Sequence, residues 1–172
     1  MALTIKPISE RFGAEISGID ITQPLDDATR KAIVDAQNDW GVTVWRNTGL
    51  GDAGHVAFSR IFGHVELAPT HGKEPRFSEP ELFDATNIDR EGNILTDENR
   101  RLINAGNRLW HIDSSYMDVR SKEALLLCHE APPIEAPTLF ADARGAYDDL
   151  PQAMKDRIDG LTARHCYFWS RM

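Results

Sequence analysis

The sequence is poor in the features that mark membrane and secreted proteins. No apolar run among its 172 residues approaches the roughly 18 residues that a membrane-spanning helix needs. Residues 1–7 do not show the basic start, apolar centre and small-residue cleavage site of a secretory signal. We therefore expect a cytoplasmic protein without a membrane partner.

Cysteines and clustered basic residues are scarce as well. Cys128 and Cys166 form no CxxC pair or other spaced metal set, and two cysteines in a cytosolic chain are usually reduced, so we assign them no role. The chain has 19 Lys and Arg against 27 Asp and Glu, a formal net charge of -8, and no basic run. Because nucleic-acid binding relies on clustered Lys and Arg, this balance argues against a nucleic-acid partner and favours small-molecule ligands.

What the sequence does contain is typical of one globular domain. Hydrophobic residues make up 41% and charged residues 27% of the chain. A chain of this length can bury one hydrophobic core. We therefore expect residues 1–172 to form a single domain.

Hydrophobic periodicity predicts short strands and helices along the chain. In the first third it predicts a hairpin over residues 3–8 and 14–16, a helix capped by Asp26 or Asp27 and closed by Gly41, a strand over 42–45 and a helix from Asp52 to Gly63. Later it predicts strands over 82–88, 124–128, 138–140 and 161–169, and helices over 143–150 and 151–158. The loop-rich segment 66–108 has the length of a functional lid.

The strongest candidate for a functional site is the segment Trp110-His111-Ile112-Asp113. On a β-strand, the period of two would place the side chains of His111 and Asp113 on the same face. One metal ion could then touch both. A mononuclear Fe(II) oxygenase site uses two histidines and one carboxylate on one side of the ion. The segment therefore supplies two of the three expected ligand types.

Other interpretations of the histidines remain open. His111 and Asp113 could be a chance pair in a polar loop. We expect His55 and His64 on the surface, and His129 and His165 in packing roles at predicted strands. His165 also remains an alternative third metal ligand.

A longer series of motifs resembles a known family. The series comprises Trp110-His111-Ile112-Asp113-Ser114-Ser115, the apolar run 124–128, Pro132-Pro133, Thr138-Leu139-Phe140, Ala146-Tyr147-Asp148-Asp149-Leu150-Pro151, Gly160-Leu161 and His165. In order and spacing it resembles the Fe(II)/2-oxoglutarate dioxygenases of the taurine dioxygenase and 2,4-dichlorophenoxyacetate dioxygenase group. Upstream, residues 13–18, 42–46 and 58–63 are similar to that group too.

The resemblance implies a fold and a reaction. The implied fold is mainly β with flanking helices, an α+β chain containing a partial double-stranded β-helix of the jelly-roll, cupin-like type. The implied enzyme uses Fe(II), the cosubstrate 2-oxoglutarate and O2 to hydroxylate a small organic acid such as a sulfonate or an aryloxyalkanoate, releasing succinate and CO2.

The resemblance also implies roles for particular residues. His111 and Asp113 match two iron ligands, and no other catalytic residue is implied. Thr138 matches a residue that helps to hold 2-oxoglutarate, and Asn107 matches a residue that lines the cosubstrate or substrate pocket. His71 and Ser114 are expected near the substrate.

Two departures from the family pattern bear on these expectations. Glu135-Ala136-Pro137 stands where the family usually has Gly-Gly-Asp. The distal iron histidine and the 2-oxoglutarate-binding arginine lie further along in relatives, so we expect a chain truncated at its C-terminus that binds Fe(II) weakly. An incomplete barrel would leave strand edges unpaired, and we therefore expect self-association or a homo-oligomer. The alternative function is a catalytically silent remnant that acts as an interaction module.

Overall fold

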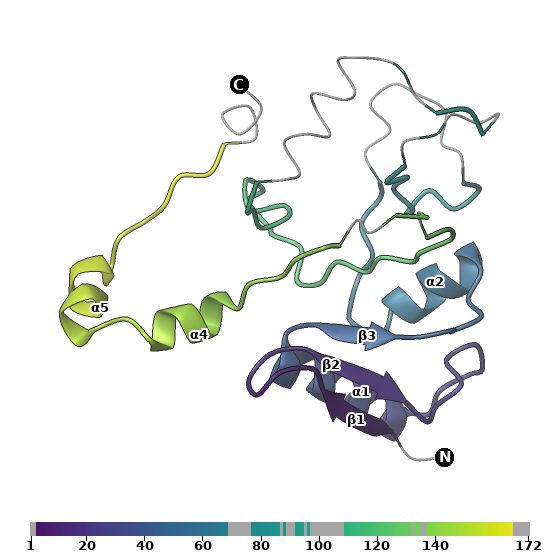
Figure 1. The fold of residues 1–172 in the computed structure, drawn as a ribbon, viewed down its shortest axis with the longest axis horizontal. Helices are drawn as coiled ribbons and strands as arrows, with labels where there is room; N and C mark the ends of the chain where they lie inside the picture. The colour runs from purple at the N-terminus through teal and green to yellow at the C-terminus, as the bar shows by residue number, and fades with distance from the viewer. Residues whose placement is uncertain are drawn as a thin grey trace. The chain divides into compact units, whose positions relative to one another are not determined.

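The computed structural model describes residues 3–68, 77–86, 88, 92–94, 96, 109–131, 133–134 and 137–166 (Figure 1). The chain divides into two compact units. The first unit consists of Met1–Val65 and Leu127–Gly160, and the second of Glu66–Leu126 and Leu161–Met172. The expectation of one dioxygenase domain over residues 1–172 stays a prediction, because this division describes only how tightly the segments pack.

A three-stranded sheet forms the centre of the first unit. Strands β1 (Thr4–Pro7) and β2 (Ala14–Ser17) pair antiparallel, and β2 pairs parallel with β3 (Thr43–Trp45), in the order β1-β2-β3. Two parallel strands need a crossover between them, and helix α1 (Asp27–Trp40) supplies it (Figure 1). The predicted hairpin and the strand over 42–45 are confirmed.

Helix α1 begins and ends at the residues that the sequence predicted. The Asp26 carboxylate accepts a hydrogen bond from the backbone N–H of Thr29 at 2.7 Å, which satisfies one free donor of the first turn. At the other end, Gly41 has a φ of 71° and donates its N–H to the carbonyl of Gln37 at 2.9 Å. A Cβ at Gly41 would lie 2.8 Å from the Phe12 ring, so this position requires glycine for space as well as for backbone conformation.

The Asp26 cap makes the stability of the first unit depend on pH. The hydrogen bond from the Thr29 backbone, supported by the Thr29 hydroxyl, lowers the pKa of Asp26 below its ordinary value. As the pH falls, the Asp26 carboxylate is therefore protonated in the unfolded chain before it is protonated in the folded chain. The stabilisation is fully present above about pH 4, the usual range of an aspartate, and is lost as the pH falls through the lower folded pKa.

We expect the Asp26→Ser variant to keep the helix cap and to lose this part of the acid sensitivity. Asp26→Ala should lose both the cap and the acid sensitivity. Urea unfolding followed by circular dichroism at pH 3 and pH 7 measures the difference. An Asp26→Ser variant whose stability falls between these pH values as much as that of the unsubstituted chain would contradict the assignment.

The core of the first unit lies between α1 and the sheet. Ala14, Ile16 and Ala36 are buried together, and Leu3, Trp40 and Trp45 pack against them. Ile33, one turn before Ala36 on the same helix face, is 1% exposed. Burial of these apolar side chains is the main favourable contribution to the stability of the unit.

Three further helices follow the expected order. Helix α2 (Asp52–Ser59) buries Val56 and Phe58, and the Phe58 ring packs edge-on against Trp45 at 5.4 Å between ring centroids. Helices α4 (Ala143–Asp148) and α5 (Gln152–Ile158) flank Pro151, which is the N-cap residue of α5. These helices confirm the predicted ones, although α2 ends before Gly63 and α4 before Leu150.

Helix α4 is linked to the end of α1 by one side chain. The Arg144 guanidinium donates hydrogen bonds to the carbonyls of Asn38 and Asp39, the latter at 3.3 Å. The last carbonyls of a helix have no partner within the helix and carry partial negative charge, so an arginine is well suited to them.

Several predicted strands are absent from the described residues. The described parts of 82–88, 124–128, 138–140 and 161–169 contain no strand, apart from one isolated bridge between Ile88 and Ile94. The His111–Asp113 segment is likewise not a strand. A strand needs a neighbouring backbone to pair with, whereas an apolar run reports only side-chain preference. These segments find no such partner within the described part of the chain, so this prediction was wrong for them.

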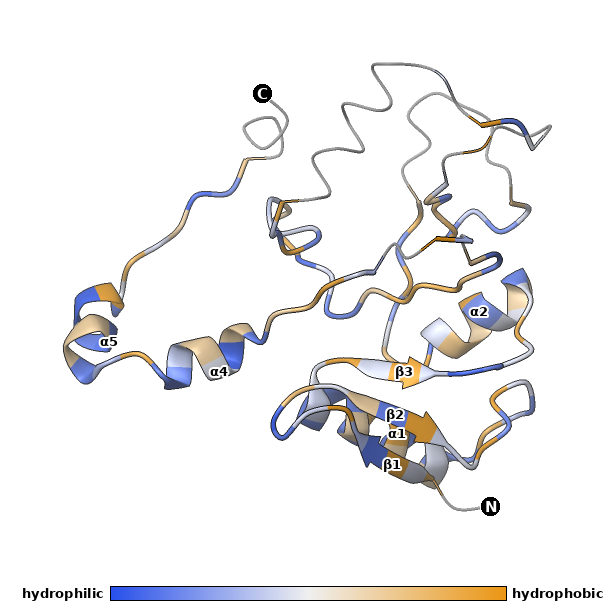
Figure 2. Ribbon diagram, in the orientation of Figure 1, coloured by the Kyte–Doolittle hydropathy of each residue, from blue (hydrophilic) through white to orange (hydrophobic). Residues whose placement is uncertain are grey.

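Large apolar side chains are exposed along these unpaired segments. Figure 2 shows hydrophobic colour along the coil between α2 and α4 as well as within the sheet. Trp110 is 70% exposed, Leu126 76% and Phe140 61%.

The architecture is α+β, with a small sheet and a few helices. No helix in the described ranges combines the length and apolar character needed to cross a membrane.

Candidate metal centre

The candidate site lies on a turn in the second unit. Residues 113–116 form the turn, and the N–H of Met117 donates to the carbonyl of Ser114 at 2.9 Å. Ser114 has a φ of 56°, in the left-handed region that residues with a side chain rarely occupy. The chain therefore reverses direction directly after Asp113.

The turn brings His111 and Asp113 together without a strand. His111 Nε2 lies 3.2 Å from Asp113 Oδ1. His111 Nδ1 lies 2.7 Å from the carbonyl oxygen of Leu109, which can only accept a hydrogen bond. This contact places a ring proton on Nδ1, so Nε2, the nitrogen that faces the carboxylate, is the one a metal ion would bind.

The two facing atoms suit neighbouring positions around a metal ion. Nitrogen and oxygen ligands lie about 2.1 Å from a first-row transition metal, so two ligand atoms at right angles are about 3.0 Å apart. The observed 3.2 Å is close to that separation. The Leu109 carbonyl adds the usual second contact of a metal-binding histidine, which fixes its tautomer and ring orientation. His111 and Asp113 therefore fit two positions of an Fe(II) site.

The described residues do not supply a complete metal site. They contain no group of three or more His, Cys, Asp or Glu side chains that could hold a metal ion. His165, the alternative third ligand, instead has its Nδ1 atom 2.9 Å from the hydroxyl of Ser115. His165 is therefore close to the turn but is not grouped with His111 and Asp113.

The other predicted site residues are only partly described. Thr138 lies on an exposed coil segment of the first unit. Ser114 directly follows Asp113 on the turn. Asn107 and His71 lie outside the described residues, as does most of the predicted lid. The structure therefore brings together His111, Asp113 and Ser114 from the predicted set.

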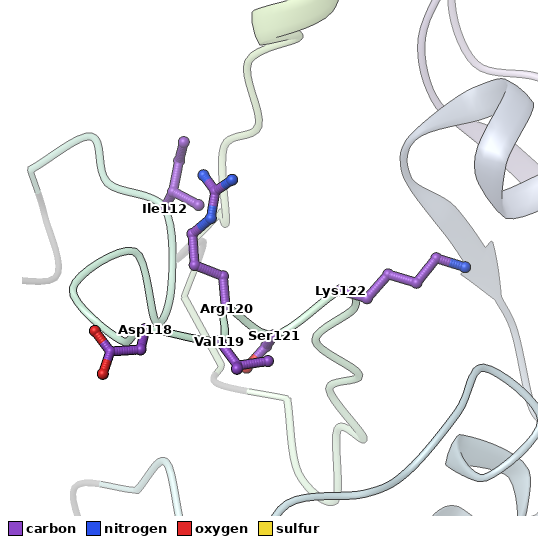
Figure 3. Close-up of a pocket in the computed structure, with 6 residues that line it drawn as sticks. All are labelled: Ile112, Asp118, Val119, Arg120, Ser121 and Lys122. Carbon is purple, nitrogen blue, oxygen red and sulfur yellow. The ribbon is translucent and has the colours of Figure 1, made fainter. Parts of the chain in front are cut away.

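A pocket adjoins the turn and was not predicted from the sequence. It is lined by Ile112, Asp118, Val119, Arg120, Ser121 and Lys122. Figure 3 shows the Arg120 side chain extending toward Ile112, while those of Asp118 and Lys122 point away to opposite sides. Within the described segments, Arg120 and Lys122 have no ion-pair partner. Two basic residues nine and eleven positions after a histidine are too common a pattern to predict this pocket.

Comparison with known proteins gives a consistent result over the whole chain. The family model for "Taurine catabolism dioxygenase TauD, TfdA family" matches residues 4–172. The alpha-ketoglutarate-dependent 2,4-dichlorophenoxyacetate dioxygenase of Cupriavidus pinatubonensis is 30% identical over 174 residues, covering 99% of this chain and 61% of that protein. The (S)-phenoxypropionate/alpha-ketoglutarate-dioxygenase of Sphingobium herbicidovorans is also 30% identical and is covered to 55% of its length.

A solved structure agrees with these relatives. AAD-2 in complex with Mn(II) and N-oxalylglycine matches with a TM-score of 0.77 and 29% identity over 99% of this chain and 58% of that one. The chain thus spans between 55% and 61% of the length of these three proteins. Sequence, family model and structural similarity agree, and the chain belongs to the TauD, TfdA family.

Proposed function

We propose that this chain carries two of the Fe(II) ligands of a 2-oxoglutarate-dependent dioxygenase. The observation that carries the proposal is the 3.2 Å approach of His111 Nε2 to Asp113 Oδ1. Family membership supports it, because relatives are named as alpha-ketoglutarate-dependent dioxygenases. N-Oxalylglycine, an analogue of 2-oxoglutarate, occupies the AAD-2 structure together with Mn(II), which supports the same metal and cosubstrate classes here.

In this proposal His111 Nε2 and Asp113 Oδ1 are the two protein atoms that bind the metal ion. The Leu109 carbonyl keeps the proton on His111 Nδ1 and leaves Nε2 free to bind. The Asp113 carboxylate contributes negative charge that offsets part of the charge of a divalent ion. Bound Fe(II) and 2-oxoglutarate would supply the oxidising chemistry, in which O2 gives one oxygen atom to succinate and one to the hydroxylated substrate, with release of CO2.

The remaining residue roles follow from the family resemblance. We propose that Thr138 and Asn107 contact 2-oxoglutarate and that His71 and Ser114 lie near the substrate. The double-stranded β-helix of the jelly-roll type is part of the same proposal. The exposed Trp110, Leu126 and Phe140 support the expected self-association.

A small organic acid is the substrate class that we favour. Relatives are named for 2,4-dichlorophenoxyacetate, for (S)-phenoxypropionate and, in Saccharomyces cerevisiae, for sulfonate. The pocket beside the turn places the Arg120 guanidinium next to the apolar Ile112, whereas the side chains of Asp118 and Lys122 point away from it. Such a lining suits a ligand with an anionic group and an apolar body.

Anaerobic titration of the chain with Fe(II) and 2-oxoglutarate tests the proposed function. We expect a visible charge-transfer absorption that requires both components, because 2-oxoglutarate can chelate the ion through its keto and carboxylate oxygens. Glutarate is the matched control, since it lacks the keto group and should give no such absorption. Absence of the absorption at saturating metal and 2-oxoglutarate would contradict the enzyme proposal and favour the silent interaction module.

A further inference from the structure

We propose that Ser114 and Ser115 clamp the metal-binding turn in place, and that His165 is a positioning residue that acts on the turn through Ser115. The inference rests on the proposed function of His111 and Asp113. It assigns a role to three side chains that do not touch the metal-binding atoms. All the residues involved belong to the second unit.

The first half of the clamp holds a strained residue. Ser114 has a φ of 56°, a conformation that persists in a residue with a side chain only when the surroundings hold it there. The Ser114 hydroxyl lies 2.8 Å from the hydroxyl of Ser121, and Ser121 donates to Glu66 Oε1 at 3.3 Å. Because a hydroxyl has one proton, Ser114 donates to Ser121, and the chain of hydrogen bonds ends on a carboxylate.

The second half of the clamp comes from a distant part of the sequence. His165 Nδ1 lies 2.9 Å from the Ser115 hydroxyl, across 50 positions of sequence. Ser115 is half-buried, and His165 is exposed on a coil segment. A hydrogen bond at this distance between separate segments fixes Ser115 relative to residues 161–166.

The two halves act on consecutive residues directly after Asp113. The separation of His111 Nε2 from Asp113 Oδ1 depends on the backbone of this turn, because the two side chains are short. Anchoring Ser114 and Ser115 limits how far Asp113 can move away from His111. The clamp therefore keeps His111 Nε2 and Asp113 Oδ1 at the distance that suits metal binding before an ion binds. This reduces the conformational entropy lost when the ion binds.

The clamp predicts weaker metal binding when His165 is removed. Partners outside the ligand set typically change metal affinity by about 10- to 100-fold, and we expect a loss of about 10-fold for His165→Ala. Because His165 acts through Ser115, the Ser115→Ala variant should show a similar loss, and the double variant should show no further loss. His165→Asn keeps a polar atom near the position of Nδ1 and should recover most of the affinity.

Mn(II) titration monitored by electron paramagnetic resonance measures the affinity, because free Mn(II) gives a signal distinct from bound Mn(II). Thermal unfolding of each variant separates a positioning effect from loss of folding, and His64→Ala is the matched exposed-histidine control. Unchanged affinity in both His165→Ala and Ser115→Ala, or fully additive losses in the double variant, would overturn the clamp alone. Absence of Mn(II) binding by the unsubstituted chain would overturn the proposed function and the clamp with it.

Discussion

His111→Ala and Asp113→Ala should each weaken Mn(II) or Fe(II) binding by more than about 100-fold, the upper range seen when only an outer partner of a metal site is lost. Each substitution removes one of the two atoms that face each other at 3.2 Å. The remaining side chain would then bind as a single exposed ligand in competition with water. Anaerobic isothermal titration calorimetry with Fe(II) measures the loss.

Control variants distinguish loss of metal affinity at His111 and Asp113 from general effects of substitution. His64→Ala removes an exposed histidine outside the turn and should leave the affinity unchanged. Asp113→Asn preserves the size of the side chain and removes its charge, so it should bind much more weakly than the unsubstituted chain. Equal affinities for His111→Ala and His64→Ala would show that the ion binds elsewhere.

Ile33→Ala should lower the free energy of unfolding by about 2–5 kcal/mol, the usual cost of such a truncation in a packed core. Ile33 is 1% exposed and is the largest fully buried side chain among the described residues. Its truncation removes buried apolar contacts of α1 and leaves a cavity. Urea unfolding followed by circular dichroism measures the change.

The same substitution at an exposed position provides the control. Ile134 is 76% exposed, and Ile134→Ala should change the free energy of unfolding by no more than about 0.5 kcal/mol. Similar losses at both positions would mean that Ile33 is not buried as described. A loss at Ile33 should also leave metal affinity unchanged while the chain is folded, since Ile33 and the metal-binding turn belong to different units.

The elements that the sequence predicted well are those specified by neighbouring residues. The bounds of α1 follow from Asp26 and Gly41, whose hydrogen bonds reach only three or four positions along the chain. The β1-β2 hairpin likewise follows from alternation across a short connection. Apolar runs such as 124–128 predicted strands wrongly, because the partner that a strand requires is not encoded in the run itself.

In the candidate site too, contacts between residues close in sequence were predictable and contacts between distant residues were not. The pairing of His111 with Asp113 was predictable from their spacing, although a turn rather than a strand brings them together. The contacts of Ser115 with His165 and of Ser121 with Glu66 were not predictable, because they join segments 50 and 55 positions apart. The sequence showed the two ligands but not the side chains that hold their turn.

The central claim is that His111 and Asp113 bind the same metal ion. Crystals of the chain grown with Mn(II) and N-oxalylglycine test it directly through anomalous scattering at the manganese edge. The account predicts one strong anomalous peak about 2.1 Å from both His111 Nε2 and Asp113 Oδ1, the distance usual for nitrogen and oxygen ligands. A manganese peak bound by other residues, with neither His111 nor Asp113 in contact with the ion, would contradict it.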